Sequence, residues 1–176
     1  MMKTIEGYTY KVSEHIGKGY SSTVHKGIQD KTGMDVSIKV IEMSKLEDPI
    51  NQMLLQLEVT ALKALSHSKH VLHLFDVYAT RNNTYIITEL CEGDLSSMLK
   101  QRKTIPYLEA VDILKQLVSG YLDVHRAGYI HRDIKPANIL YKNGIYKIAD
   151  FGFTIPIADL TQHKSYNVGS PVYMPP

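Results

Sequence analysis

The chain has 176 residues, of which 44% are hydrophobic and 22% are charged, and its net charge at neutral pH is +2. This length suits one domain, or a domain with a piece of another, and the composition is typical of a globular protein. The nearly balanced charge does not favour nucleic-acid binding, and no apolar run approaches the roughly 18 residues that a membrane span needs.

The first half of the chain alternates strand signals with one helix. Runs rich in β-branched and aromatic residues predict strands, and a glycine-containing turn separates the first two. Pro49 is expected to open a helix, because apolar residues then recur at three- and four-residue spacing as far as Leu65. The predicted strands are Tyr8–Ile16, Thr23–Ile28, Asp35–Ile41, Val71–Tyr78 and Thr84–Thr88.

After Glu89 the pattern becomes helical. Asp94 is expected to cap a short helix that reaches about Lys100, and a long helix is predicted over Pro106–Arg126, with Gly128 ending it. Short strands and loops follow, and residues 154–176 show no periodicity. The prediction is an α+β protein of one domain, residues 1–176, with a β-rich lobe at 1–89, a hinge at 90–93 and a partial helical lobe at 94–176.

A glycine-containing segment lies between the first two predicted strands. Glycines without a Cβ allow backbone N–H groups to approach phosphate oxygens closely, although two glycines between strands more often mark only a turn. The segment reads Ile16, Gly17, Lys18, Gly19, Tyr20, Ser21, Ser22, Thr23 and Val24.

Lys39 stands inside the apolar third strand, where a charged side chain needs a partner or a route to solvent. Glu58 on the next predicted helix is the candidate partner, and the pair could then hold the ammonium against phosphate oxygens. The alternatives are a surface lysine on the polar face of the strand and a solvated helix carboxylate.

The segment Ile130–Leu140, which reads IHRDIKPANIL, is followed by Asp150-Phe151-Gly152. Together with the upstream glycines and Lys39 in the correct order, these motifs resemble the catalytic loop and the D-F-G motif of eukaryotic-type protein kinases. The resemblance implies a bilobal kinase fold, with a β-rich N-lobe and an incomplete helical C-lobe, that transfers the γ-phosphate of ATP to a protein hydroxyl.

The resemblance also implies a role for each polar residue of these motifs. Asp133 would orient the substrate hydroxyl and accept its proton, and Lys135 would offset charge on the transferred phosphate. Asn138 and Asp150 would supply oxygen ligands to Mg²⁺. Lys39 would hold the α- and β-phosphates of ATP and Glu58 would hold Lys39, whereas His131 is expected to be structural and to pack near Phe151.

The adenine pocket is placed by the same resemblance. Thr88 falls at the gatekeeper position, the Glu89 carbonyl and the Cys91 N–H would bond adenine, and the Cys91 thiol itself is expected to be inert. Asp94 either reaches the ribose or serves only as a helix N-cap. The base would lie between Ile16, Val24 and Leu140, and Ser37 stands where the family usually has alanine.

Lys135 and the segment Gly169–Met174 resemble serine/threonine kinases, in which Ser170 would contact Asp133 and Lys135. IHRDIKPANIL and VGSPVYM are most similar to the Unc-51-like, autophagy-initiating branch. Arg132 would pair with a phosphate added to the activation segment by an upstream kinase or by autophosphorylation. The candidate acceptors are Thr161, Ser165 and Tyr166, with Ser165 and Tyr166 favoured.

The family pattern continues beyond Pro176, so the chain is expected to cover about two-thirds of a kinase domain. The Pro106–Arg126 helix would then expose part of its apolar face, which carries Val111, Leu114, Leu117, Val118, Tyr121 and Leu122. Three hypotheses follow: part of an active serine/threonine kinase, an inert fragment that binds ATP or a partner, and a small-molecule kinase. A single cysteine and no apolar leader favour a cytoplasmic location, with the nucleus as the alternative.

Overall fold

The computed structural model describes residues 1–160 and 169–173. It divides the chain into two compact units. The first contains residues 1–53 and 74–90, and the second contains residues 54–73 and 91–176. Thr161, Ser165 and Tyr166, the three predicted phosphate acceptors, lie outside the described residues, as does Met174.

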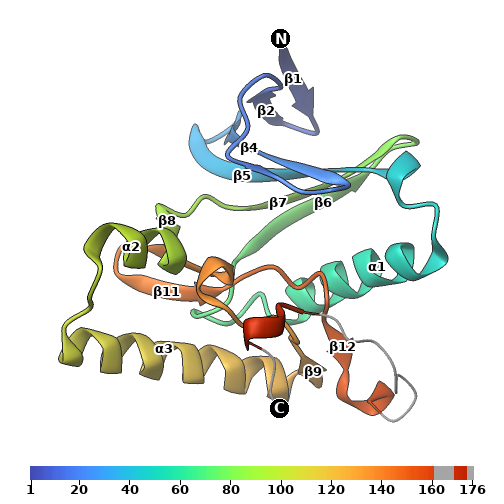
Figure 1. Cartoon of the computed structure of the whole chain (residues 1–176). Coiled ribbons are helices and arrows are strands. Elements are labelled where there is room, and N and C mark those ends of the chain that lie inside the picture. Colours follow the sequence, from blue (N-terminus) through green and yellow to red (C-terminus); the bar gives the residue numbers. More distant parts are fainter. Residues whose placement is uncertain (161–168, 174–176) are drawn as a thin grey trace. The chain divides into compact units, whose positions relative to one another are not determined.

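The first unit is built on one antiparallel sheet with the strand order β1-β2-β4-β5-β7-β6 (Figure 1). A short strand, β3, pairs with β4 outside this order. One 3-10 turn, η1, spans Met43–Lys45 after β5. The strands are β1 (Met2–Ile5), β2 (Tyr8–Lys11), β3 (Gly17–Lys18), β4 (Ser22–Gln29), β5 (Met34–Glu42), β6 (Leu74–Ala79) and β7 (Asn83–Glu89).

The sheet curls around an aromatic and β-branched core. Tyr8 on β2 donates a hydrogen bond to the carboxylate of Asp76 on β6, so these two strands approach across the core although other strands separate them in the sheet. Burial, together with this bond, raises the pKa of Tyr8 to about 12. The buried members of the core cluster are Tyr8, Tyr10, Val36, Ile38, Val40, Tyr85 and Ile87.

The first strand, β1, was not predicted from the sequence. Glu6 and Gly7 both adopt positive φ, at 45° and 82°, which matches the tight hairpin turns that join antiparallel strands. The turn pairs Ile5 with Tyr8 and Met2 with Lys11. Because Met1–Thr4 are exposed, this strand has no buried alternating pattern that sequence analysis could detect.

The predicted helix after Pro49 is confirmed as α1, Pro49–Ala64. Its predicted apolar face is only partly buried. Ala61, Leu62 and the following Leu65 are inaccessible, whereas Ile50 and Met53 are 40% and 41% exposed. Periodicity identified the helix correctly, but it overestimated how much of the face is covered.

The second unit contains the long helix α3, Tyr107–Arg126, and the short helix α2, Leu95–Arg102. A small antiparallel sheet has the order β11-β10-β8, and a separate pair joins β12 to β9. Val71 forms an isolated parallel bridge to Ile148. The remaining bounds are β8 (Gly93–Asp94), β9 (Tyr129–Ile130), η2 (Pro136–Asn138), β10 (Ile139–Lys142), β11 (Ile145–Ile148), β12 (Ile155–Pro156), η3 (Ile157–Asp159) and η4 (Pro171–Tyr173).

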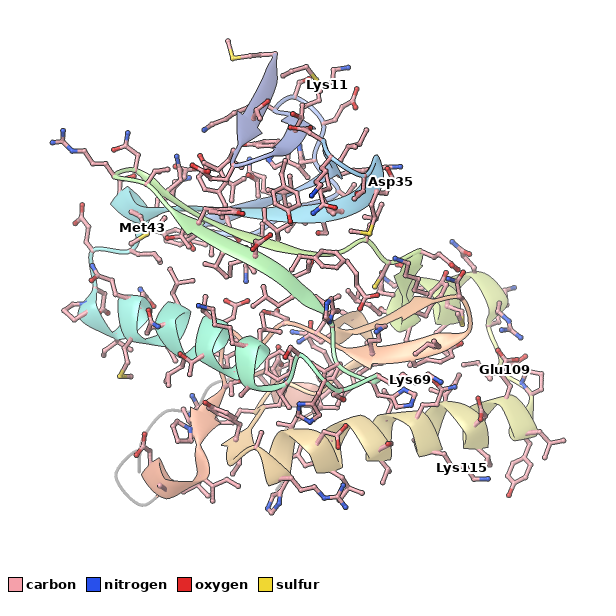
Figure 2. All side chains as sticks on the ribbon, turned by 180° about the vertical axis from the view of Figure 1, so that it is seen from behind. Lys11, Asp35, Met43, Lys69, Glu109 and Lys115 are labelled. Atoms are coloured by element: carbon pink, nitrogen blue, oxygen red, sulfur yellow. The ribbon has the colours of Figure 1, made fainter. Side chains whose placement is uncertain are left out.

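Helix α3 buries a different side from the one with the most apolar residues. Ile113, Gly120 and Val124 are buried, while Leu114 and Val118 on the predicted apolar face are 61% and 58% exposed. Lys115 extends from the side of α3 that faces away from β11 (Figure 2). The partial exposure expected for the apolar face is therefore present.

Gly120 marks a close approach between α3 and the loop that follows α1. A Cβ added to Gly120 would lie 2.6 Å from the carbonyl oxygen of His70, closer than real Cβ contacts come. The same loop is fixed by Ser68, whose hydroxyl donates to Asp123 of α3 at 2.7 Å. Glycine at residue 120 thus allows the loop to lie directly on the helix.

The α+β class and the kinase-like fold are confirmed, with a curled antiparallel sheet in the first unit and few helices. The units change at Leu90/Cys91, within the predicted hinge, but residues 54–73 group with the second unit. The predicted lobe boundaries stay a prediction. In the described part of the chain, no helix is both long and apolar enough for a membrane span.

Candidate active site

Four of the predicted nucleotide-binding residues share one face of the sheet in the first unit. Val24 of β4 is the register partner of Lys39 on β5, and Ser37 on β5 is the partner of Thr88 on β7. Register partners point to the same face, and residues two apart on a strand do as well. Val36, Ile38 and Val40 alternate with Ser37 and Lys39 and lie in the core, so the predicted nucleotide residues occupy the opposite face.

The glycine segment forms the hairpin between β3 and β4. The Gly19 N–H donates to the Ser22 carbonyl at 2.8 Å and closes the turn. A Cβ on Gly19 would lie 3.1 Å from the Ser22 hydroxyl, so the serine at this position leaves little room for a side chain on the glycine. At the tip, Tyr20 is 88% exposed.

Asp94 is an N-cap. Its Oδ1 accepts the backbone N–H of Ser97 at 2.8 Å and its Oδ2 accepts the Ser97 hydroxyl at 2.7 Å, which starts helix α2. Of the two roles considered for Asp94, the capping role is confirmed and the ribose contact stays a prediction. Antiparallel pairing of β8 with β10 places Leu140 opposite Asp94, so these two candidates lie side by side in the second unit.

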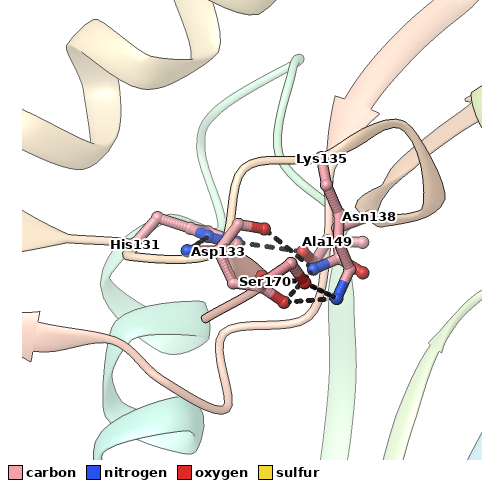
Figure 3. A network of polar contacts seen from close by, with 6 residues as sticks. All are labelled: His131, Asp133, Lys135, Asn138, Ala149 and Ser170. Atoms are coloured by element: carbon pink, nitrogen blue, oxygen red, sulfur yellow. Dashed lines mark hydrogen bonds and ion pairs between the residues drawn. The ribbon is translucent and has the colours of Figure 1, made fainter. Parts of the chain in front are cut away.

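A polar network centres on Asp133 (Figure 3). The Lys135 ammonium donates to Asp133 Oδ2 at 2.7 Å, and the Asn138 amide donates to the same oxygen at 2.8 Å. Ser170 donates its hydroxyl to Asp133 Oδ1 at 2.9 Å and accepts from Lys135 at 2.8 Å. The contacts predicted for Ser170 are thus present in the described geometry.

The electrostatics of this network keep Asp133 ionised. Burial by itself raises the pKa of a carboxyl group, and Asp133 is only 3% exposed. The hydrogen bonds from Lys135, Ser170 and Asn138 together outweigh burial, and they leave the pKa of Asp133 below its ordinary value. Near neutral pH the side chain is therefore a carboxylate, which accepts hydrogen bonds and does not donate them.

His131 is buried and structural, as predicted. Its Nε2 lies 3.0 Å from the Ala149 carbonyl, and its Nδ1 accepts the Asp133 N–H at 3.2 Å. These partners require a neutral imidazole that carries its proton on Nε2. Burial lowers the pKa of His131 and keeps the ring neutral, and the ring packs edge-on against Phe151 with centroids 4.8 Å apart.

The predicted magnesium ligands are joined through the backbone. The Ala149 N–H donates to the Asn138 carbonyl at 2.9 Å, so the residue before Asp150 is tied to Asn138. Because the Asn138 amide nitrogen bonds Asp133, the oxygen end of that amide is the end that can face a cation. Carboxylate and amide oxygens are the donors that Mg²⁺ prefers, so these residues fit the ion.

In the part of the chain that the structure describes, no group of three or more His, Cys, Asp or Glu side chains is arranged so that it could hold a metal ion by itself. A cation at Asn138 and Asp150 would therefore depend on further ligands such as phosphate oxygens and water, which is the usual arrangement for Mg²⁺ bound with a nucleotide.

Glu58 and Arg132 also lie in the second unit. Glu58 is buried, and its Oε2 is 4.0 Å from the position of a Cβ added to Gly152. Its pairing with Lys39 stays a prediction. Arg132 has φ 67° and donates from Nε to the Phe153 carbonyl at 2.6 Å, which fixes the start of the segment where its predicted phosphate partner would lie.

Sequence reasoning missed two buried polar residues, one in each unit. Thr154 is fully buried, and its hydroxyl has no hydrogen-bond partner in the described structure. His25 is buried next to the glycine segment and bonds the Glu14 carbonyl. Neither residue belongs to a local motif, and for His25 the only sequence signal was a histidine inside a predicted strand.

A family model described as protein kinase domain matches residues 10–176. Cell division control protein 7 of Schizosaccharomyces pombe is 35% identical over 99% of this chain and 16% of its own length. Serine/threonine-protein kinase atg1 of Dictyostelium discoideum is 33% identical over 95% of the chain and 26% of its own length. CDPK-related kinase 4 of Arabidopsis thaliana is 32% identical over 99% of the chain. The chain spans 30% or less of the length of each of these relatives.

Proposed function

Because the chain belongs to the protein kinase domain family, we propose that it transfers the γ-phosphate of ATP to serine and threonine hydroxyls of protein substrates. The observation that carries this proposal is the network in which Lys135, Asn138 and Ser170 converge on the Asp133 carboxylate. Relatives named as serine/threonine kinases support the choice of hydroxyl.

In this mechanism Asp133 receives the substrate hydroxyl. Each carboxylate oxygen can accept more than one hydrogen bond, so Oδ1 can bind a substrate hydroxyl while it still accepts from Ser170. The lowered pKa of Asp133 makes it a weak base, so its main contribution is to orient the attacking oxygen. The hydroxyl proton moves to Asp133 as the new phosphorus–oxygen bond forms and the bond between the γ-phosphorus and the departing ADP breaks.

The positive groups neutralise phosphate charge. Lys135 is held against Asp133 and Ser170, which fixes its ammonium beside the attacking oxygen. Asn138 and Asp150 would hold Mg²⁺, which would offset the charge of the phosphate oxygens when it is bound. Lys39, on the sheet face shared with Val24, Ser37 and Thr88, would bind the α- and β-phosphates.

Phosphate transfer from γ-labelled ATP to a degenerate mixture of serine, threonine and tyrosine peptides tests the proposal. Wild-type protein with Mg²⁺ should label the serine and threonine peptides, and Asp133→Asn should lower the rate by about 10²- to 10⁴-fold through loss of hydroxyl positioning and proton acceptance. The matched control is Asp112→Asn on the exposed surface of α3, which should keep the wild-type rate.

Two results would overturn the proposal. One is an Asp133→Asn protein that labels peptides as fast as wild type. The other is a folded wild-type chain that binds Mg·ATP but transfers no phosphate, which favours the inert, ATP-binding alternative.

A further inference from the structure

Strand β4 pairs with β2 and then with β3, and its backbone hydrogen bonds are interrupted between these two partners, just before the glycine segment. β2 pairs with β4 from Tyr8↔Gln29 to Tyr10↔Gly27, and pairing resumes only at Gly17↔Val24. Residues 11–15 therefore lie between the two paired stretches, opposite residues 25 and 26 of β4, and Ile16 already donates its N–H to the Val24 carbonyl at 2.8 Å. An interruption of this kind removes ladder hydrogen bonds and bends the strand, so the path of the chain into the next turn depends on local bonds, such as Glu14 N–H to the Lys11 carbonyl, and on side-chain contacts.

The side chain of His25 spans this interruption. Its Nδ1 lies 2.8 Å from the Glu14 carbonyl, which can only accept, so Nδ1 carries a proton and donates it. Its Nε2 lies 2.9 Å from the Thr23 hydroxyl. Glu14 precedes the glycine segment and Thr23 lies at its end, so one imidazole bonds both the incoming and the outgoing chain.

The ring is held rigidly. His25 is 4% exposed and packs against Tyr10 with ring centroids 4.9 Å apart. In the register His25 opposes Ile38, which belongs to the core face of the sheet, whereas Val24 opposes Lys39 on the other face. The imidazole therefore lies on the opposite side of the sheet from the predicted nucleotide residues and can act on a nucleotide only through the loop.

A simpler reading is that His25 is a core histidine that has found any two hydrogen-bond partners. The positions of its two hydrogen-bond partners, Glu14 and Thr23, favour a role in positioning the loop over simple burial in the core. Both bonds go to segments that flank Gly17 and Gly19. Of the backbone bonds nearby, Ile16 N–H to Val24 and Gly19 N–H to Ser22 close the loop from within, and Glu42 N–H to Ser21 joins the far side of the loop to β5. Of these contacts, the His25 bond to Glu14 is the one that ties the loop to the chain before it.

We propose that His25 is a positioning residue that sets the glycine loop, residues 16–24, for binding the phosphates of ATP. The inference rests on the proposed use of ATP. The His25 side chain then holds the loop in the alignment that an uninterrupted row of backbone hydrogen bonds would otherwise provide. Losing these bonds should weaken phosphate binding without changing the groups that touch the phosphates.

The variants separate hydrogen bonding from ring packing. His25→Phe keeps an aromatic ring against Tyr10 and removes both bonds, whereas His25→Gln retains an amide that can donate to Glu14. His15→Phe, at an exposed histidine before the loop, is the matched control. For each variant, the Kd of Mg·ATP and of adenosine is measured by calorimetry, and backbone amide exchange is measured without nucleotide.

His25→Phe should raise the Kd of Mg·ATP by about tenfold, the effect of losing about one hydrogen bond, and should change the Kd of adenosine less than about twofold. The amides of residues 17–24 should exchange faster, with β5 and β7 unchanged. His25→Gln should recover most of the affinity, and His15→Phe should match wild type in both measurements.

Equal weakening of adenosine and Mg·ATP would overturn the inference, because it indicates a general loss of folding. Wild-type exchange of the loop amides in His25→Phe would overturn it as well. If wild-type protein binds no Mg·ATP, the proposed function fails, and the exchange of the nucleotide-free loop still decides whether His25 holds it.

Discussion

Substituting Gly120 by alanine tests the close approach between α3 and the loop that follows α1. In an exposed helix this change would stabilise by about 1 kcal/mol through helix propensity. Here the new Cβ would meet the His70 carbonyl oxygen at 2.6 Å and the His70 Cβ at 2.9 Å. The oxygen belongs to the backbone, so the contact can be relieved only by moving the loop or the helix.

The cost can be estimated from these contacts. Overpacking of a rigid site costs about 1–3 kcal/mol, and two contacts under 3.0 Å place Gly120→Ala at the upper end. The same His70 carbonyl accepts the Ile148 N–H at 2.9 Å, and strain on that bond adds about 1 kcal/mol. After the gain in propensity, the free energy of unfolding should fall by about 2–3 kcal/mol.

Thermal and urea unfolding, followed by circular dichroism, measure this change. A loss of about 2–3 kcal/mol in a domain of this size corresponds to a Tm lower by roughly 4–12 °C. Ser119→Ala, at an exposed neighbouring position of α3, is the control and should change Tm by less than about 2 °C. A Gly120→Ala protein as stable as wild type, or more stable, would refute the close contact between α3 and the loop.

Three further predictions concern buried polar groups of the second unit. Thr154→Val removes a buried hydroxyl without a described partner and should raise the free energy of unfolding by about 1 kcal/mol in urea titrations; destabilisation would contradict the burial of that hydroxyl. Ser170→Ala removes a bond that lowers the pKa of Asp133, so the acid limb of the kcat/KM profile should move to higher pH; an unmoved limb would argue against the contact. Because the pKa of His131 is lowered in the folded protein, its imidazole is protonated at a higher pH in the unfolded chain, below about pH 6.5, than in the folded chain. Stability should therefore decline between pH 7 and 5 more steeply in wild type than in His131→Phe, as Tm measured across this range will show.

Contiguous motifs could be interpreted from the sequence because their chemistry is local. The segment around Asp133 and the Asp150-Phe151-Gly152 tripeptide each hold several functional groups on a short stretch of chain, so spacing alone restricted their arrangement. Asp94 was recognised as a possible N-cap for the same reason, since its partner Ser97 is three residues away.

Features that depend on distant partners could not be predicted in this way. The sequence showed an apolar stripe on α3, but only packing decided that the side with Gly120 is buried and that Leu114 is exposed. Likewise, His25 acquires its role because the ladder of β4 breaks opposite Glu14, and a strand pattern does not show where pairing stops. Periodicity describes one segment at a time.

By itself the sequence determined the kinase family, the helices that begin near Pro49, Asp94 and Pro106, and the identity of the groups around Asp133. The tertiary structure alone decided the hairpin at Met2–Ile5, the approach of α3 to His70, and the bridge that His25 makes across the start of the glycine loop. The physical reason is that local spacing fixes which groups a segment carries, whereas strand register and close packing fix which segments meet.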